Sequence, residues 1–173
     1  VSRMIQDTGA ADWLGVATVA EALELRASDI ELPILKLSVA RGPEVEAAVA
    51  AEITLCVVDE ASIAEAADAA VRQGVEVDLH LKIDTGMRRI GAEPADAVWL
   101  AELVDATPGV RLGGLFSHLP VSDAPSGVEF TRAQTALFAW VAAQVEAARG
   151  PVPLKHLANS GVLNARPAPQ VNH

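Results

Sequence analysis

Residues 81–91, LKIDTGMRRIG, gather cations and a carboxylate at the end of an otherwise apolar run. Alternation along a strand places His80, Lys82 and Asp84 on one face. The two arginines after Met87 would lie on the following loop, where a guanidinium can hold a carboxylate or phosphate through two parallel hydrogen bonds. The pattern predicts an anion-binding site at the strand end. The structural alternative is a buried ion pair between Lys82 and Asp84 beside a solvated pair of arginines.

A histidine closes a second apolar run, 112–119, which reads LGGLFSHL. An imidazole at a strand end can act as an acid or base, bind a metal, or stack on a flat ligand. The structural alternative is that His118 is a hydrogen-bonded residue with no part in chemistry.

A third stretch, KHLANSG, ends a strand-like run before a short helix. The hydroxyl of Ser160 and the backbone N–H groups around Asn159 and Gly161 can form an anion cradle at a helix N-terminus. The alternative is a plain Asn/Ser helix cap. His156 lies two residues before Ala158, so both are expected to face the interior.

The composition narrows the class of protein. The 173 residues are enough for one domain with a core, and the net charge of −10 disfavours nucleic acid as a partner. The single cysteine, Cys56, allows no internal disulfide and is expected to be an inert core residue. The histidines show no metal-ligand spacing, and no run resembles a membrane span or signal peptide. We therefore expect a cytoplasmic protein without a metal and without a membrane or nucleic-acid partner.

Elements that would position these residues alternate regularly along the chain. Apolar strand-like runs are predicted at 13–18, 33–38, 53–58, 77–84, 112–119 and 154–160. Helices are predicted at 18–27, 43–50, 59–74, 94–106 and 128–150. Thr18 and Glu21 form a capping-box pattern, and Gly74 and Gly150 stand at predicted helix C-termini. Trp13, Trp99 and Trp140 are expected to lie in the core or at helix–sheet contacts.

Nearly continuous apolar strands separated by helices indicate a parallel α/β sheet. A doubly wound sheet and a (β/α)8 TIM-type barrel both fit this alternation. No G-x-G-x-x-G follows the first strand, and polar residues gather at the C-terminal ends of several strands, as barrel active sites require. We favour a barrel that is incomplete, because six strand-like runs are present where a barrel needs eight.

Four stretches, taken together, resemble alanine racemase, a fold-type III pyridoxal-phosphate enzyme. They are GAADWLGVATVAEALELR (9–26), HLKIDTGMRRIG (80–91), GLFSHLPVSDAP (114–125) with the following T-R-x-Q-x-x-x-F (131–138), and HLANS (156–160). The second stretch is the most specific. The chain departs from the family pattern at Leu119, Pro120 and Leu157.

The resemblance implies racemisation of L-alanine and D-alanine for peptidoglycan precursors, with pyridoxal 5'-phosphate as cofactor and a homodimer in the full-length protein. Arg89 occupies the position of the arginine that contacts the phenolic oxygen of the cofactor and the carboxylate of the small amino acid substrate. Met87 lines the substrate side. Lys82 occupies a position that is carbamylated in many members, where the resulting anion braces the arginine.

The same resemblance assigns the remaining strand ends. His118 resembles the histidine packed on the pyridine ring of the cofactor. Ser160 resembles a phosphate ligand, with Asn159 and His156 as its support.

Two catalytic groups of the family have no counterpart in the sequence. The Schiff-base lysine matches none of the chain's lysines, which are Lys36, Lys82 and Lys155, and the opposing tyrosine is absent because the chain has no tyrosine. The resemblance therefore implies that residues 1–173 are a partial N-terminal barrel domain with strands two to seven, without strands one and eight and without the C-terminal β-domain. We expect no catalytic residue in the chain and no racemase activity from it alone.

Three alternatives remain open on the sequence. The chain could belong to a non-catalytic pyridoxal-phosphate-binding barrel protein, to a barrel that binds nothing, or to a racemase of another amino acid such as serine.

Overall fold

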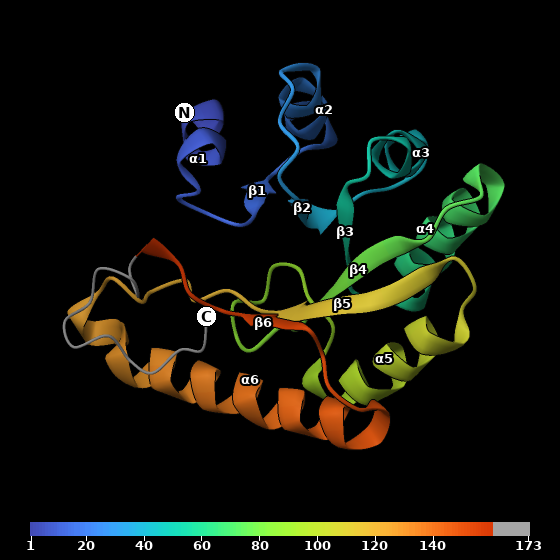
Figure 1. Cartoon of the computed structure of the whole chain (residues 1–173). Helices are drawn as coiled ribbons and strands as arrows, with labels where there is room; N and C mark the ends of the chain where they lie inside the picture. The colour runs from blue at the N-terminus through green and yellow to red at the C-terminus, as the bar shows by residue number, and fades with distance from the viewer. Residues whose placement is uncertain (161–173) are drawn as a thin grey trace. The chain divides into compact units, whose positions relative to one another are not determined.

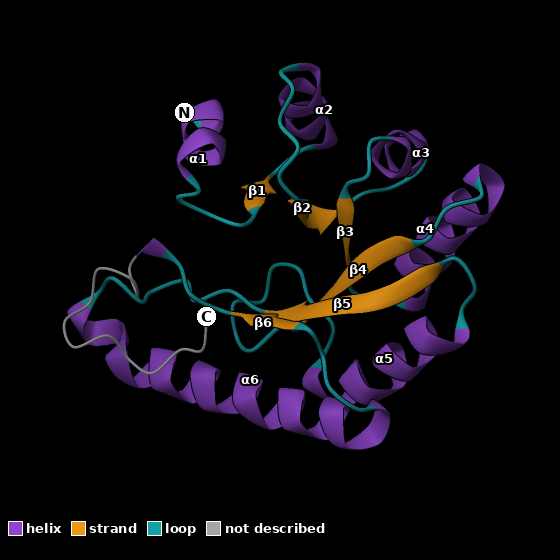
Figure 2. Ribbon diagram, viewed as in Figure 1, coloured by secondary structure: helices purple, strands orange, loops and turns teal. Residues whose placement is uncertain are grey.

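The computed structural model describes residues 1–160 and shows strands alternating with helices along the chain (Figures 1 and 2). The strands are β1 (Leu14–Val16), β2 (Ile34–Val39), β3 (Thr54–Val57), β4 (Val77–Lys82), β5 (Val110–Phe116) and β6 (Leu154–His156). The helices are α1 (Ser2–Thr8), α2 (Val19–Ala27), α3 (Pro43–Ala50), α4 (Glu60–Gln73), α5 (Ala97–Ala106) and α6 (Val128–Arg149). Each strand falls within or overlaps a predicted apolar run, so the predicted alternation is confirmed.

The strands form one sheet in the order β1-β2-β3-β4-β5-β6. The pairs β1–β2, β2–β3 and β5–β6 are parallel. A doubly wound sheet places later strands on the other side of the first one, whereas a TIM-type barrel adds each strand beside the one before it. The sequential order therefore agrees with part of a TIM-type barrel and excludes the doubly wound alternative.

The chain divides into two compact units, which are described separately. Unit 1 comprises Val1–Leu79 with Val104–Arg111, and unit 2 comprises His80–Leu103 with the chain from Leu112 onward. No helix within residues 1–160 is both long and apolar enough to cross a bilayer.

Helix α2 of unit 1 begins with the predicted capping box. The Glu21 N–H donates to Thr18 Oγ1 at 3.2 Å, and the Thr18 N–H donates to Glu21 Oε2 at 3.0 Å. These two bonds satisfy backbone donors that the first turn of a helix leaves without partners. Gly74, at the end of α4, adopts the left-handed conformation with φ 69°, as its predicted cap position requires.

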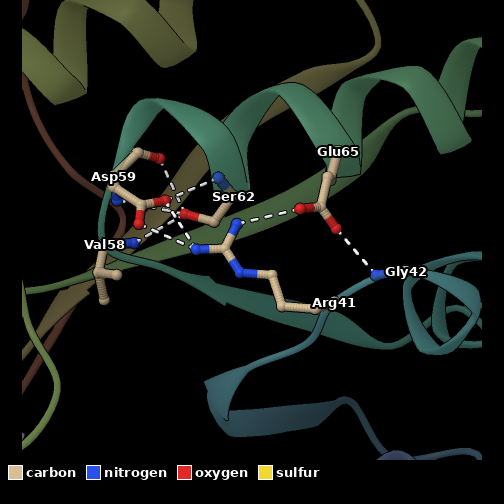
Figure 3. A network of polar contacts seen from close by, with 6 residues as sticks. All are labelled: Arg41, Gly42, Val58, Asp59, Ser62 and Glu65. Atoms are coloured by element: carbon tan, nitrogen blue, oxygen red, sulfur yellow. Dashed lines mark hydrogen bonds and ion pairs between the residues drawn. The ribbon is translucent and has the colours of Figure 1, made fainter.

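An arginine clamp fixes the loop after β2 to helix α4 in unit 1 (Figure 3). The Arg41 guanidinium donates to Asp59 Oδ2 at 2.9 Å and to Glu65 Oε1 at 3.1 Å. The second oxygen of Glu65 accepts the Gly42 N–H at 2.9 Å. Asp59 also caps α4, because its Oδ1 accepts the Ser62 N–H at 2.7 Å. One carboxylate thus both starts the helix and receives the arginine.

Lys36 is a buried structural lysine of β2, with 3% of its surface exposed. The pairing of β2 with β3 shifts register between Lys36 and Val39. The ammonium donates to Ser38 O, Ser38 Oγ and Val39 O at 3.0, 2.9 and 3.2 Å. A register shift leaves carbonyl groups outside the regular ladder, and the lysine satisfies them.

The tryptophan prediction was wrong at two positions. Trp99 and Trp140 are 51% and 57% exposed, because the apolar faces of α5 and α6 are supplied by other residues such as Leu100 and Val141. Cys56 is buried in β3, as expected.

Helix α6 of unit 2 packs alongside the strand that follows it (Figure 1). Glu146 Oε1 accepts from Lys155 Nζ at 2.5 Å and from the Val152 N–H at 3.1 Å. β6 is shorter than its predicted run and ends at His156. Beyond it, Asn159 donates to the Leu119 carbonyl of the loop after β5. The predicted helix 94–106 begins with a 3-10 turn, Pro94–Asp96.

Candidate active site

The C-terminal ends of β4, β5 and β6 lie together in unit 2. The Ile83 N–H donates to Phe116 O at 2.8 Å, and the Ser117 N–H donates to His156 O at 3.4 Å. These bonds join the residues that directly follow β4 and β5 to the neighbouring strand ends. In a TIM-type barrel this end of the sheet holds the active site.

Two histidines and a phenylalanine form a compact group below these strand ends. His80 Nδ1 lies 3.0 Å from His156 Nε2, and the His156 ring stacks on Phe116 with centroids 4.8 Å apart and an interplanar angle of 8°. His80 is 1% exposed. Burial lowers the pKa of His156 to about 4, so its ring is neutral near pH 7.

Gly114 of β5 makes room for this group. A Cβ atom at Gly114 would lie 2.7 Å from His80 Cε1, closer than side-chain atoms approach one another. The glycine in the stretch GLFSH is therefore required by the ring opposite it.

Lys82 lies at the end of β4 and is only 5% exposed. Its ammonium stands 5.2 Å from the centroid of the Phe116 ring, within the range of a cation–π interaction.

The loop after β4 is organised by Asp84. Its Oδ1 accepts the backbone N–H groups of Gly86 at 2.8 Å and Arg88 at 3.1 Å. The chain then returns to β4, where the Ala92 N–H donates to Lys82 O at 2.8 Å. Asp84 therefore acts on the backbone of the D-T-G loop, a role that the sequence analysis did not weigh.

The two arginines of the loop differ in their surroundings. Arg88 Nη1 donates to Glu93 Oε1 at 3.0 Å, an exposed ion pair, and Arg88 adopts a positive φ of 59°. Arg89 is exposed and makes no hydrogen bond or ion pair with the rest of residues 1–160. Its guanidinium is therefore available to an anion.

His118 is half-buried just beyond β5, and the charges of Arg89 and Lys82 both act on its imidazole. Burial lowers its pKa most, and the positive charges of Arg89 and Lys82 lower it further. The three side chains, predicted from two separate stretches, thus share one electrostatic environment. A neutral imidazole beside two cations is suited to a flat, anionic ligand.

The predicted residues after β6 behave differently from one another. Asn159 Nδ2 donates to Leu119 O at 2.7 Å, and Ser122 Oγ donates to Asn159 Oδ1 at 2.6 Å. Asn159 thereby ties the loop after β5 to the end of β6. Ser160 is exposed and is the last residue that the structure describes. Gly161, the third member of the predicted anion cradle, lies outside the described residues, and Met87 is half-buried on the D-T-G loop.

The sequence analysis missed a buried polar group that joins two of these loops. Thr85 Oγ1 lies 2.8 Å from Ser117 Oγ, and Gln134 Nε2 donates to Thr85 Oγ1 at 3.3 Å and to His118 O at 3.2 Å. Thr85, Ser117 and Gln134 all stand in the quoted stretches. The available signal was that Gln134 falls at an apolar-face position of the predicted helix 128–150, where a polar side chain needs a buried partner.

Comparisons with known proteins point to one family. Residues 1–173 match the family "Alanine racemase, N-terminal domain". An alanine racemase of Cutibacterium acnes is 45% identical over 163 residues, which cover 94% of this chain and 44% of the relative. An alanine racemase of Synechocystis is 39% identical over 153 residues, covering 87% of this chain and 40% of the relative.

A solved structure gives the same result for the fold. The alanine racemase of Clostridium difficile 630 in complex with cycloserine superposes with a TM-score of 0.87 at 29% identity, covering 94% of this chain and 44% of that one. The chain thus spans less than half the length of the relatives it matches. On the family match over residues 1–173 and the 45% identity, the chain belongs to the alanine racemase family and corresponds to its N-terminal domain.

Proposed function

We propose that this chain is the cofactor-binding barrel part of a longer, pyridoxal-phosphate-dependent alanine racemase. That protein would interconvert L-alanine and D-alanine for peptidoglycan precursors, as a cytoplasmic homodimer. The observation that carries the proposal is the position of the Arg89 cation near a half-buried His118, whose pKa is lowered, at the strand ends. This positive site belongs to a chain whose net charge is −10, so the bulk charge does not account for it.

The charges and ring at these strand ends fit pyridoxal 5'-phosphate. The cofactor is a flat aromatic ring that carries a phosphate and a phenolic oxygen. The half-buried neutral imidazole of His118 offers a flat partner, and the Arg89 cation that lowers its pKa offers attraction for the anionic oxygens. Ser160 adds an exposed hydroxyl that can donate to an anionic oxygen.

Each side chain then has one task. Arg89 would bind the phenolic oxygen and the substrate carboxylate, Met87 would line the substrate side, and His118 would pack on the ring. Asn159 would hold the loop after β5 through the Leu119 carbonyl, and His156 would brace the strand ends through His80. When bound, the cofactor withdraws electrons from Cα of the amino acid, which makes its proton removable.

Lys82 would support Arg89 in the form of a carbamate. Reaction with carbon dioxide needs a neutral amine, and a site with 5% exposure favours the neutral form. The amine nitrogen would bond the carbon of carbon dioxide and release one proton to water, so the product is an anion that would attract the guanidinium that the ammonium repels.

The proton-transfer groups are proposed to lie outside these 173 residues. The Lys36 ammonium donates hydrogen bonds to Ser38 and Val39, and the Lys155 ammonium donates to Glu146. We therefore propose that neither lysine forms the covalent bond to the cofactor. The sequence contains no tyrosine to serve as the opposing base. We therefore expect the chain alone to be inactive.

The test is exchange of the alanine α-proton in deuterium oxide, measured with the full-length protein, with residues 1–173 alone, and with both after addition of pyridoxal phosphate. The proposal expects exchange and racemisation only from the full-length protein. Exchange by the chain alone would show that the reacting groups lie within it.

Two further outcomes identify the alternatives. A full-length protein that develops the cofactor's visible absorbance but exchanges no amino acid proton would be a non-catalytic carrier. Faster exchange with serine than with alanine would make it a serine racemase. A protein that shows no cofactor absorbance and no exchange would refute the cofactor site.

A further inference from the structure

We propose that Gln134 of α6 is a positioning residue that holds the loop after β4 and the loop after β5 in one arrangement. The consequence for catalysis rests on the proposed function, because these loops carry Arg89 and His118. The structural part of the inference concerns the protein without its cofactor.

The side-chain amide of Gln134 contacts both loops at once. Its Nε2 donates to Thr85 Oγ1 at 3.3 Å, in the loop after β4, and to the His118 carbonyl at 3.2 Å, in the loop after β5. The two loops are also joined directly, because Thr85 Oγ1 lies 2.8 Å from Ser117 Oγ. Gln134 is 1% exposed, and the two hydroxyl residues are 6% and 7% exposed.

The His118 carbonyl fixes which way the amide points. A carbonyl can only accept a hydrogen bond, so the nitrogen end of the Gln134 amide must face it. The reversed amide would set two acceptors against each other in a buried place. Both donor hydrogens of Gln134 are therefore committed, one to each loop.

The burial of Gln134 is not explained by stability alone. Its Oε1 accepts no hydrogen bond from residues 1–160, and a buried acceptor without a partner is unfavourable. A leucine at this position would fill a similar volume without that loss. A buried side chain with one unpaired acceptor is most simply explained by the two bonds that its amide nitrogen makes.

Helix α6 also packs on the D-T-G loop directly. A Cβ atom at Gly86 would lie 3.0 Å from Phe130 Cζ and 3.8 Å from Gln134 Cγ. Gln134 touches neither the Arg89 guanidinium nor the His118 imidazole by any of its bonds. It therefore acts through the backbone that carries these side chains, and a change in it should loosen both loops together.

The experiment compares Gln134→Leu with Gln144→Leu in the full-length protein. Gln144 lies on the same helix, is exposed, and serves as the matched control. Amide hydrogen exchange without cofactor is followed in segments 84–92 and 117–123. We expect exchange in both segments to rise about tenfold or more in Gln134→Leu and to stay at the wild-type rate in Gln144→Leu.

The same variants are then loaded with pyridoxal phosphate. Misplaced loops should lower kcat roughly 10- to 100-fold and weaken the visible circular dichroism of the cofactor, while the control keeps both. Unchanged exchange in both segments, or a rise in one segment only, overturns the inference. If Gln134→Leu does not fold, Gln134→Asn, whose amide is one methylene too short to reach both partners, is judged by the same criteria.

The exchange measurement keeps this inference separate from the proposed function. A wild-type protein that binds no pyridoxal phosphate would refute the function, yet loosening of both loops in Gln134→Leu would still support the role of the glutamine. Conversely, an active wild type with two unaffected loops would refute only the role of Gln134.

Discussion

His80 Nδ1 lies 3.0 Å from His156 Nε2, and this contact joins β4 to β6 beneath the candidate site. One ring must donate and the other accept, so the pair is compatible with two neutral imidazoles in matched tautomers. Phe116 covers the His156 ring, and burial lowers the pKa of that ring to about 4. Protonation of His156 should therefore oppose folding.

The first prediction concerns the pH dependence of stability. The pKa of His156 falls from 6.5 in the unfolded chain to about 4 in the folded one, so the unfolded chain binds the extra proton first as the pH falls. Stability should be complete above pH 6.5 and should decline toward pH 4, by up to about 3 kcal/mol for this group. Urea denaturation between pH 4 and 8 measures it, with His156→Gln as the comparison. The variant should show a flatter decline, and an equal slope in both proteins would contradict the role of His156.

The second prediction concerns the glycine opposite His80. Gly114→Ala places a methyl group 2.7 Å from a ring that is fully enclosed, so it should reduce the free energy of unfolding by about 1–3 kcal/mol. Gly15→Ala is the matched control, because it also lies in a strand without a positive φ and meets only the flexible end of Leu37, at 3.2 Å. Denaturant unfolding of both variants tests this, and equal losses would show that the His80 ring can move aside.

The elements of the fold were predictable because their signals are local. The helix predicted at 43–50 was found at Pro43–Ala50, and the Thr18–Glu21 capping box was visible in four residues of sequence. The grouping of polar residues at strand ends was also predictable, because parallel strands bring their C-terminal ends to one edge. Lys82 and Arg89 were drawn from one stretch and His118 from another, and the three share one environment in the structure.

The partners of individual side chains were not predictable in the same way. Gln134 bonds residues 49 and 16 positions away, and only the packing of α6 determines which ones. The sequence could not show that Glu93 would form its ion pair with Arg88 and not with the adjacent Arg89. Trp99 and Trp140 were misassigned because the residue type alone does not show which face of a helix a tryptophan lies on.

The third prediction separates a helix cap from an exposed ion pair in the Arg41 clamp. Asp59→Ala removes the bond to the Ser62 N–H as well as the arginine contact, so it should cost about 1–2 kcal/mol of stability. Arg41→Ala removes only half-exposed ion pairs and should cost less than about 1 kcal/mol. Thermal unfolding at low and high salt distinguishes the two, since only the arginine contribution should weaken with salt. A larger loss in Arg41→Ala would mean that the loop, and not the cap, limits stability.

The fourth prediction concerns the charge around His118. Arg89→Gln removes the larger of the two cationic influences on this imidazole, so the pKa of His118 should rise. It should stay below the usual value of 6.5, because burial, the largest cause of the lowering, is unchanged, and Lys82 remains. Histidine ring resonances in an NMR titration give the pKa, with His118→Asn identifying the signal.

Arg88→Gln is the control for this titration, because Arg88 is the adjacent cation on the same loop and is paired with Glu93. It removes the same charge from the chain, so any effect of net charge alone would appear equally in both variants. If Arg89 faces the histidine as the structure has it, only Arg89→Gln raises the pKa of His118. Equal shifts in the two variants would show that the guanidinium of Arg89 is no closer to the imidazole than that of Arg88, and would remove Arg89 as the anion-binding group beside it.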